Sequence, residues 1–262
     1  MRRPNGIKAK KHLSQNFLTD QNIVRKIIHS VNLKKDDRVL EIGPGYGAMT
    51  FPIIEILGSI DVIELDHDLV NFLNEKNTNN AMNIIQADAL SYDFTSLRKE
   101  KPMRLIGNLP YHISTPLMFH LLQFSSLFQD FHVMVQKEVA DRIVSGHNNK
   151  IYGRLSVAIQ ARCEASKVFD VKPNAFNPRP KVNSSIIRLV PKTKMDPKID
   201  QNLTKVIKLA FNQRRKKILN SLKEIFTVEQ LLNKGVDPNA RAENLSIEDY
   251  LRLSNLEKEK TK

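Results

Sequence analysis

The chain has 262 residues, of which 41% are hydrophobic, enough for a substantial core in one large domain with a small second domain. Its 41 lysines and arginines outnumber its 28 aspartates and glutamates, and the resulting net charge of +13 indicates a polyanionic partner. No apolar run reaches the ~20 residues of a membrane-spanning helix, and no apolar segment follows the charged N-terminus as it would in a secretory signal. The single cysteine excludes a disulfide framework. We therefore expect a cytoplasmic protein without a membrane partner.

Two clusters of basic residues favour nucleic acid over a membrane as the partner. Residues 1–12 are predicted to form a basic, flexible N-terminal arm that an anion orders, and four consecutive cations occupy positions 214–217. Neither cluster lies on a strongly amphipathic helix with bulky apolar anchors, as a membrane-binding helix would. In these two clusters the expected RNA contacts are Arg2, Arg3, Lys10, Lys11, Arg214 and Arg215.

The first half of the chain alternates between helix and strand patterns from residue 19 to about residue 141. Thr19 or Asp20 can cap a first helix, and Ser114 or Thr115 can cap a later one that reaches about Phe128. Strands are predicted at residues 38–43, 60–64, 83–88, 103–107 and 131–136, with helices between them. This alternation predicts an α/β fold with a parallel sheet covered on both faces.

The second half of the chain changes character near residue 190. Residues 154–164 and 182–190 alternate in part and are predicted as the last two strands. Arg179 and Lys181 lie in the stiff loop between them, and we expect both to contact RNA, together with Arg154. Residues 145–150 are polar and contain glycine, which predicts a flexible loop. Residues 191–197 resemble a linker, and further helices are predicted at 201–212, 213–226, 228–234 and 246–255, the last with Ser246 and Asp249 as a capping box. We therefore predict an α/β domain at 13–190 and a small helical RNA-recognition domain at 191–262.

A glycine-rich turn and two acids follow successive predicted strands. Residues 41–47 read E-x-G-x-G-x-G, and a glycine such as Gly43 lets the backbone turn tightly and lets a ligand approach the strand end. Glu64 ends the next strand, where an acid of a doubly wound sheet commonly accepts the two hydroxyls of a ribose. Asp88 ends the third strand, and either accepts from an adenine amino group or caps the turn that follows. Together these residues favour a nucleoside-bearing cofactor.

The segment Asn108-Leu109-Pro110-Tyr111 ends the fourth strand. Asn108 offers an amide oxygen, and Pro110 stiffens the turn and leaves the Leu109 carbonyl available as a second acceptor. Tyr111 adds a flat aromatic face with a polar tip. These groups can hold a planar amine between two acceptors and an aromatic lid. The alternative is an ordinary proline turn between a strand and a helix.

All four features lie at carboxyl ends of predicted strands, where open α/β sheets bind ligands. The chain has no G-x-x-x-x-G-K-[ST] phosphate loop, and its isolated histidines show no metal-ligand spacing, so neither an NTPase site nor a metal site is expected. S-adenosylmethionine fits, because an exocyclic amine of a base taken out of its stack can attack the methyl sulfonium. Two acceptors on the amine would make its nitrogen more nucleophilic, and positioning would supply most of the rate without a dedicated general base.

Several motifs, in the right order, make the chain resemble a known family. It resembles the ribosomal RNA adenine dimethyltransferases and, within them, the KsgA (RsmA) subfamily, from residue 15 to about residue 253. The segments that carry the resemblance are QNFL at 15–18, EIGPGYG at 41–47, NLPY at 108–111, YGRLS at 152–156, FNPRPKV at 176–182 and DPNARAEN at 237–244.

The resemblance implies both a fold and an activity. The fold is a Rossmann-like class I methyltransferase domain that uses S-adenosylmethionine, followed by a small all-helical domain. The activity is N6-dimethylation of two adjacent adenosines near the 3′ end of small-subunit (16S) rRNA during ribosome biogenesis, by an enzyme that we expect to be a monomer. The implied cofactor-binding residues are Asn16, Leu18, Gly43, Glu64, Asp88 and Asn108. The implied catalytic residues at the target base are Asn108, Leu109, Pro110 and Tyr111.

Two other functions fit parts of the sequence. Ser14 and His112 are more typical of the Erm-type methyltransferases, which modify large-subunit RNA, whereas residues 211–215 and 237–244 resemble KsgA. A non-catalytic RNA chaperone or ribosome-assembly factor would use the basic surface alone. Retention of radiolabelled S-adenosylmethionine would separate an enzyme from such a binding protein.

Overall fold

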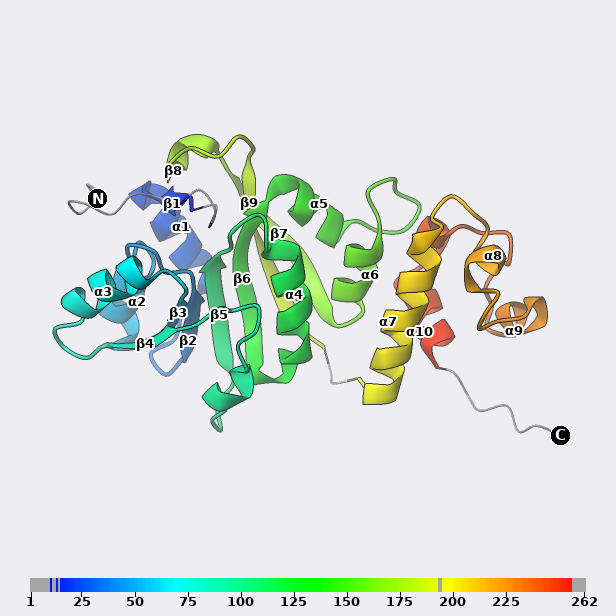
Figure 1. Ribbon diagram of the computed structural model, residues 1–262, viewed down its shortest axis with the longest axis horizontal. Helices are drawn as coiled ribbons and strands as arrows, with labels where there is room; N and C mark the ends of the chain where they lie inside the picture. The colour runs from blue at the N-terminus through cyan, green and yellow to red at the C-terminus, as the bar shows by residue number, and fades with distance from the viewer. Residues whose placement is uncertain (1–9, 11–12, 14, 193–194, 256–262) are drawn as a thin grey trace. The chain divides into compact units, whose positions relative to one another are not determined.

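The computed structural model describes residues 10, 13, 15–192 and 195–255, which form two compact units (Figure 1). The first unit combines residues 1–140 with 166–191, and the second combines 141–165 with 192–262. The predicted domain boundary near residue 190 stays a prediction, and residues 141–165, expected in the first domain, belong here to the second unit. In the described part of the chain, no helix has the length and apolar character needed to cross a bilayer.

A seven-stranded sheet forms the centre of the first unit, in the order β4-β3-β2-β5-β6-β9-β7. The strands in that order are Met82–Gln86, Ile60–Glu64, Val39–Ile42, Met103–Asn108, Phe128–Gln136, Ser184–Pro191 and Cys163–Val171. The first five are parallel, as predicted, and β9 runs antiparallel to β6. Every residue of β2 is buried, as is typical of a strand covered on both faces.

Helices between the strands cover the sheet on both faces. The helices of this part of the chain are α1 (Gln21–Val31), α2 (Thr50–Leu57), α3 (His67–Lys76), α4 (Ser114–Gln123) and α5 (Lys137–Val144). Asp20 caps α1, as predicted, by accepting from the Asn22 and Ile23 N–H groups. The chain proceeds outward from β2 to β4 and returns to β5, and right-handed crossovers place the helices before and after this reversal on opposite faces. Figure 1 shows α4 in front of the sheet.

Two predicted elements are wrong. The strand predicted at 154–164 is instead α6 (Arg154–Gln160), followed by the start of β7. Residues 155–159 are all buried, so the segment lacks the polar face by which an amphipathic helix is recognised. Helix α4 begins after Ile113 without a side-chain cap, because Ser114 donates its hydroxyl to the Tyr111 carbonyl, and it ends at Gln123 rather than near residue 128.

The second unit is helical apart from the start of β7. Its helices after α6 are α7 (Pro197–Asn212), α8 (Ile218–Leu222), α9 (Val228–Asn233) and α10 (Ile247–Ser254). Phe211 stacks on Tyr250 with ring centroids 5.9 Å apart, and the buried Tyr250 hydroxyl donates to the Ala242 carbonyl at 2.7 Å. Ser246 and Asp249 form the predicted capping box at the start of α10. Burial raises the pKa of the Cys163 thiol to about 12.

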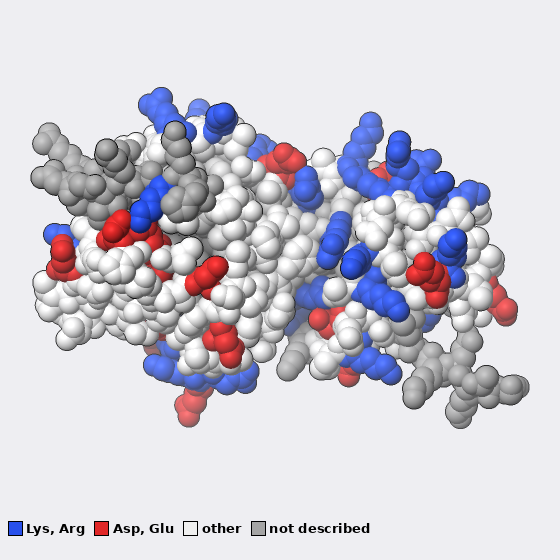
Figure 2. Space-filling view, viewed as in Figure 1, with Lys and Arg blue, Asp and Glu red and all other residues white. Residues whose placement is uncertain are grey.

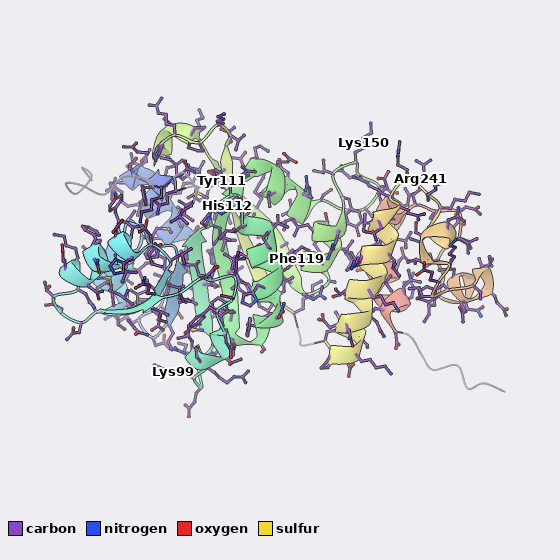
Figure 3. All side chains as sticks on the ribbon, viewed as in Figure 1. Lys99, Tyr111, His112, Phe119, Lys150 and Arg241 are labelled. Atoms are coloured by element: carbon purple, nitrogen blue, oxygen red, sulfur yellow. The ribbon has the colours of Figure 1, made fainter. Side chains whose placement is uncertain are left out.

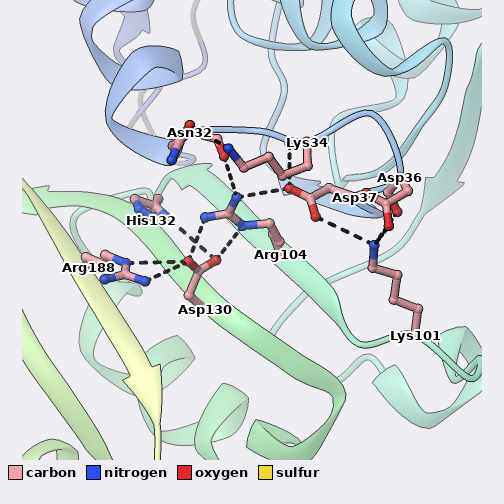
Figure 4. Close-up of polar contacts among 9 residues, drawn as sticks. All are labelled: Asn32, Lys34, Asp36, Asp37, Lys101, Arg104, Asp130, His132 and Arg188. Atoms are coloured by element: carbon pink, nitrogen blue, oxygen red, sulfur yellow. Dashed lines mark hydrogen bonds and ion pairs between the residues drawn. The ribbon is translucent and has the colours of Figure 1, made fainter.

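A buried ionic network closes the amino-terminal end of the sheet (Figure 4). The guanidinium of Arg104 on β5 donates to both oxygens of Asp130 on β6, at 2.9 and 2.7 Å, and to Asp37 at 3.0 Å. His132 Nδ1 lies 3.6 Å from Asp130, and Arg188 lies 3.4 Å from it. Burial acts to raise the pKa of Asp130, but the imidazole and the guanidinium outweigh it and hold that pKa well below its usual range.

Candidate active site

A cavity of about 280 Å³ opens at the carboxyl ends of β2, β3 and β5. Every residue that the sequence predicted for the cofactor and the target base lines it: Asn16, Leu18, Gly43, Glu64, Asp88, Asn108, Leu109, Pro110 and Tyr111. The structure therefore brings together the residues expected at strand ends, and with them Asn16 and Leu18, which only the resemblance implied.

The glycine turn forms one wall of the cavity. Gly43, Gly45 and Gly47 all have positive φ, a conformation that other residues rarely adopt. At Gly45, with φ of 57°, an added Cβ would also lie 2.9 Å from the Phe17 ring. The Gly45 N–H donates to Glu64 Oε2 at 3.3 Å. Gly45 thus lets the turn pack against the N-terminal segment and hold the acid of the next strand.

Glu64 lies at the end of β3 with 7% of its surface exposed. Its Oε1 accepts from the Leu65 and Asp66 N–H groups, each at 2.9 Å. Burial raises the pKa of this carboxyl, and the backbone hydrogen bonds oppose the shift. The backbone therefore fixes the carboxyl at the cavity wall, where its remaining lone pairs can accept from hydroxyl groups.

Glu41 is a second buried acid of the cavity, and the sequence analysis assigned it no role. It is 1% exposed, and its Oε2 accepts the hydroxyl of Thr50 at 2.6 Å. Burial, supported by the nearby charge of Glu64, raises its pKa to about 7. Its place two residues before the first glycine of the turn was the signal that could have identified it.

Asn108 ends β5 with its side chain held in one orientation. Its Nδ2 donates to the Asn16 carbonyl at 2.8 Å, and because a carbonyl oxygen can only accept, the amide group has its nitrogen on that side. The Asn108 Oδ1 is thereby left as an acceptor for a ligand amine. The Leu109 N–H donates to Met134, and the Pro110 carbonyl accepts from Ile113, so the backbone of the turn is also fixed.

Tyr111 and His112 lie beyond this turn (Figure 3). The Tyr111 hydroxyl is 2.6 Å from Ser184 Oγ, and Ser184 is fully buried on β9. Burial raises the pKa of the Tyr111 phenol, and the bond to Ser184 opposes the shift. The ring is therefore held by its polar tip. His112 also lines the cavity, although the sequence analysis gave it no catalytic role.

The N-terminal segment closes another side of the cavity. Its β1 (Phe17–Leu18) pairs antiparallel with β8 (Phe176–Asn177). Gln15 donates to Asp66 at 2.8 Å, and the Lys10 ammonium lies 2.5 Å from Asp66 and 2.7 Å from Asp68. Lys10, predicted to contact RNA, is thus paired with acids beside the cavity.

The other predicted RNA contacts lie at several places on the chain. Arg2, Arg3 and Lys11 lie outside the described residues. Four of the predicted RNA contacts have exposed side chains: Arg154 at the start of α6, Arg179 and Lys181 between β8 and β9, and Arg215 after α7. Arg214 is half-buried and paired with Glu243. Figure 2 shows lysines and arginines spread more widely than acids over the drawn face of the second unit.

Among the described residues, no group of three histidine, cysteine, aspartate or glutamate side chains has a metal-binding arrangement. The cavity therefore offers organic polar groups to a ligand: two buried carboxyls, a fixed amide and an aromatic ring.

Strand order and cavity together define a Rossmann-like class I methyltransferase, as the sequence predicted. Residues 6–259 match the family model for ribosomal RNA adenine dimethylase, and the chain belongs to this family. It is 46% identical to ribosomal RNA small subunit methyltransferase A of Photorhabdus laumondii over 252 residues, 94% of this chain and 93% of that protein. The corresponding protein of Hahella chejuensis is 46% identical over 253 residues, 95% of this chain and 93% of that protein.

Solved structures of related enzymes share the fold. A dimethyladenosine transferase from Plasmodium falciparum is 26% identical with a TM-score of 0.76, covering 90% of this chain and 95% of that one. The 23S rRNA methyltransferase ErmE is 25% identical with a TM-score of 0.70, covering 91% of this chain and 98% of that one. The predicted resemblance is confirmed, and the chain is an rRNA adenine methyltransferase.

Proposed function

We propose that this enzyme uses S-adenosylmethionine to methylate twice the exocyclic amine of two adjacent adenosines near the 3′ end of small-subunit rRNA. The observation that carries the proposal is the fixed amide of Asn108, a residue that lines the same cavity as Glu64. Relatives that are 46% identical to the chain are named for the small subunit, whereas ErmE, named for 23S rRNA, is 25% identical.

The cavity residues fit S-adenosylmethionine. Glu64 would accept the ribose hydroxyls, Asp88 would accept from the adenine amino group, and the glycine turn would let the cofactor approach the end of β2. In the described part of the chain, Glu41 and Glu64 form no ion pair, so two buried acids favour a ligand that carries positive charge. When bound, the cofactor supplies an electrophilic methyl group on a sulfonium.

The turn after β5 would hold the target amine. Asn108 Oδ1 and the Leu109 carbonyl would accept its two N–H groups, which draws the lone pair out of conjugation with the ring. Tyr111 would stack on the base once it has left the RNA helix. Held in this way, the amine nitrogen would be placed to accept the methyl group that the cofactor would supply, and the amine proton would leave to solvent. Positioning of the amine supplies the rate enhancement.

The proposed partner is the small ribosomal subunit, met in the cytoplasm by a monomeric enzyme. The net charge of +13 supports a phosphate-rich partner. Binding should weaken steeply as salt is added, because phosphate contacts release counterions.

The test is methyl transfer to small and large subunits that lack the modification, with the modified bases mapped. We expect transfer to two adjacent adenosines of the small-subunit RNA. Modification of large subunits alone would contradict the proposal, and retention of labelled cofactor without transfer would favour a pure binding role.

A variant links this test to the cavity. Glu64→Ala should weaken cofactor binding severely while circular dichroism stays unchanged, because the ribose loses its charged acceptor. Glu55→Ala is the matched control, since Glu55 is an exposed acid on α2. A near-normal dissociation constant for Glu64→Ala would remove Glu64 from the cofactor site.

A further inference from the structure

Two neighbouring arginines of the second unit have different surroundings. Arg215 is exposed, whereas Arg214 has 38% of its side chain exposed and uses both sides of its guanidinium. Its Nε donates to Glu243 Oε2 at 2.7 Å, and its Nη2 donates to the Lys150 carbonyl. A guanidinium engaged in this way has fewer N–H groups left for a phosphate.

The partners of Arg214 also hold a loop. The Asn148 N–H donates to the Glu243 carbonyl at 2.8 Å, and Asn244 Nδ2 donates to Asn148 Oδ1 at 2.9 Å. Asn148 has φ of 61°, so these bonds stabilise a conformation that few residues adopt. The loop of residues 145–150, predicted to be flexible, is thus fixed by Arg214 and by the turn of residues 241–244.

This arrangement sets the positions of several cations. Lys150 and Arg241 lie on the two segments that Glu243 and Arg214 join, and Figure 3 shows both at the same end of the unit. The backbone of Arg241 pairs with that of Lys217, whose ammonium donates to Asn239 at 2.8 Å. These bonds connect the 145–150 loop, the 241–244 turn and the 214–217 run into one hydrogen-bonded frame. The exposed cations of the three segments all lie on this frame.

We propose that Arg214 is a positioning residue: its ion pair with Glu243 holds the 145–150 loop so that Lys150 and its cationic neighbours can meet the phosphates of the rRNA. The proposal rests on the proposed function for its RNA partner. Arg214 was predicted to contact RNA directly. In this proposal it acts through the loop, and Arg215 and the other exposed cations contact the phosphates.

The two roles of Arg214 predict opposite effects at Glu243. If Arg214 contacts phosphate, Glu243 is an acid that repels RNA, and Glu243→Gln should tighten binding. If Arg214 positions the loop, Glu243→Gln should weaken binding, because a neutral amide oxygen accepts from the guanidinium less strongly than a carboxylate does.

The experiment measures binding of unmodified small subunits at several salt concentrations. Arg214→Gln and Glu243→Gln should each weaken binding several-fold with little change in the salt slope, and the double variant should be no weaker than either. KM for the subunit should rise while kcat is kept. Arg215→Gln should instead reduce the salt slope by about 1. Lys198→Gln, which changes an exposed cation near the start of α7, is the control and should alter neither quantity.

A conservative variant separates charge from geometry. Arg214→Lys keeps the positive charge but cannot donate from a planar fork to both the Glu243 carboxylate and the Lys150 carbonyl. We expect it to resemble Arg214→Gln. Wild-type binding by Arg214→Lys, a salt slope reduced by about 1 in Arg214→Gln, or tighter binding by Glu243→Gln would each overturn the proposal.

Hydrogen exchange tests the frame without RNA. Exchange of the Asn148 amide should accelerate in Arg214→Gln and Glu243→Gln but not in Arg215→Gln, because only the first two weaken the Arg214–Glu243 ion pair next to the Asn148 hydrogen bond. Accelerated exchange with unchanged RNA binding would restrict Arg214 to a structural role and overturn the proposal. Failure of the wild-type enzyme to bind or methylate small subunits would instead contradict the proposed function, whatever the exchange rates show.

Discussion

Buried carboxyl groups at the two ends of the sheet have different partners and opposite pKa shifts. At the amino-terminal end, Asp130 is fully buried but meets the Arg104 guanidinium and His132, which hold its pKa low. At the carboxyl end, Glu41 and Glu64 are also buried, yet they accept from a hydroxyl and from backbone N–H groups, and burial raises their pKa values.

This difference separates a structural site from a functional one. The amino-terminal network pairs its buried carboxyl groups with the Arg104 guanidinium, so no ligand is needed there to balance their charge. At the carboxyl end, Glu41 and Glu64 have no cationic partner among the described residues, which costs stability and leaves favourable interactions for a ligand. Substitutions at four positions can test this comparison, from the largest expected effect to the smallest.

Asp130→Ala should cause the largest loss of stability. It leaves Arg104 buried without its bidentate partner, and breaking such a pair typically costs about 3–5 kcal/mol. Urea unfolding measures the loss, and cofactor affinity of the folded enzyme should persist. Asp36→Ala, which removes an exposed acid paired with Lys101, is the control and should have little effect. An equally small effect of Asp130→Ala would contradict the structural role of the network.

Asn108→Ala should cause the largest loss of rate. It removes one proposed acceptor of the target amine and leaves the Leu109 carbonyl, and losing a positioned polar group of this kind typically costs about 10²–10³ in rate. Single-turnover methyl transfer at saturating cofactor measures it. Asn71→Ala, on the exposed face of α3, should transfer methyl groups normally. Full turnover by Asn108→Ala would show that the turn after β5 has only a structural role.

Glu41→Gln should change the pH dependence of stability. The pKa of Glu41 is about 7 in the folded enzyme against 4.5 for the ordinary carboxyl, so the folded state favours the protonated form. Stability from this group is present below pH 4.5 and is lost as the pH rises through 7, by up to about 3 kcal/mol. Glu41→Gln should flatten the free energy of unfolding over this range, whereas Glu55→Gln should not. An unchanged profile would show that Glu41 is not the titrating group.

Tyr111 should show the smallest effects. Tyr111→Ala removes the stacking face, worth about 1–3 kcal/mol per base, and should lower the rate accordingly. Tyr111→Phe keeps the ring and loses only the bond to Ser184, so most activity should remain. If both variants were equally inactive in methyl transfer, the phenol would take part in the chemistry.

The sequence predicted the site better than it predicted the surface. Glu64 and Asn108 follow strands with clear apolar patterns, and parallel strands bring their carboxyl ends to one edge, so the two residues had to meet. The pairing of Arg214 with Glu243 joins residues 29 positions apart in irregular segments, where no periodicity indicates which side chains meet. The raised pKa of Glu41 likewise depends on burial by residues distant in sequence.

The mistaken strand at 154–164 has a related cause. Pattern recognition needs a polar face, and α6 has five consecutive buried residues. Helix and strand cannot be distinguished by periodicity in so short a buried run. The capping residues Asp20 and Ser246 were predicted correctly, because their hydrogen bonds are local.

The pairing of β1 with β8 has a consequence for biosynthesis. Thr19, next to β1, donates its hydroxyl to Ala175, 156 positions later in the sequence. Translation therefore produces β1 long before its partner strand, and the Asn16 carbonyl that orients Asn108 directly precedes β1. A nascent chain released from the translating ribosome before Asn177 would have its glycine turn and its acids, but not β8, which pairs with the strand that follows Asn16. We therefore expect methyl transfer only after synthesis has passed Asn177.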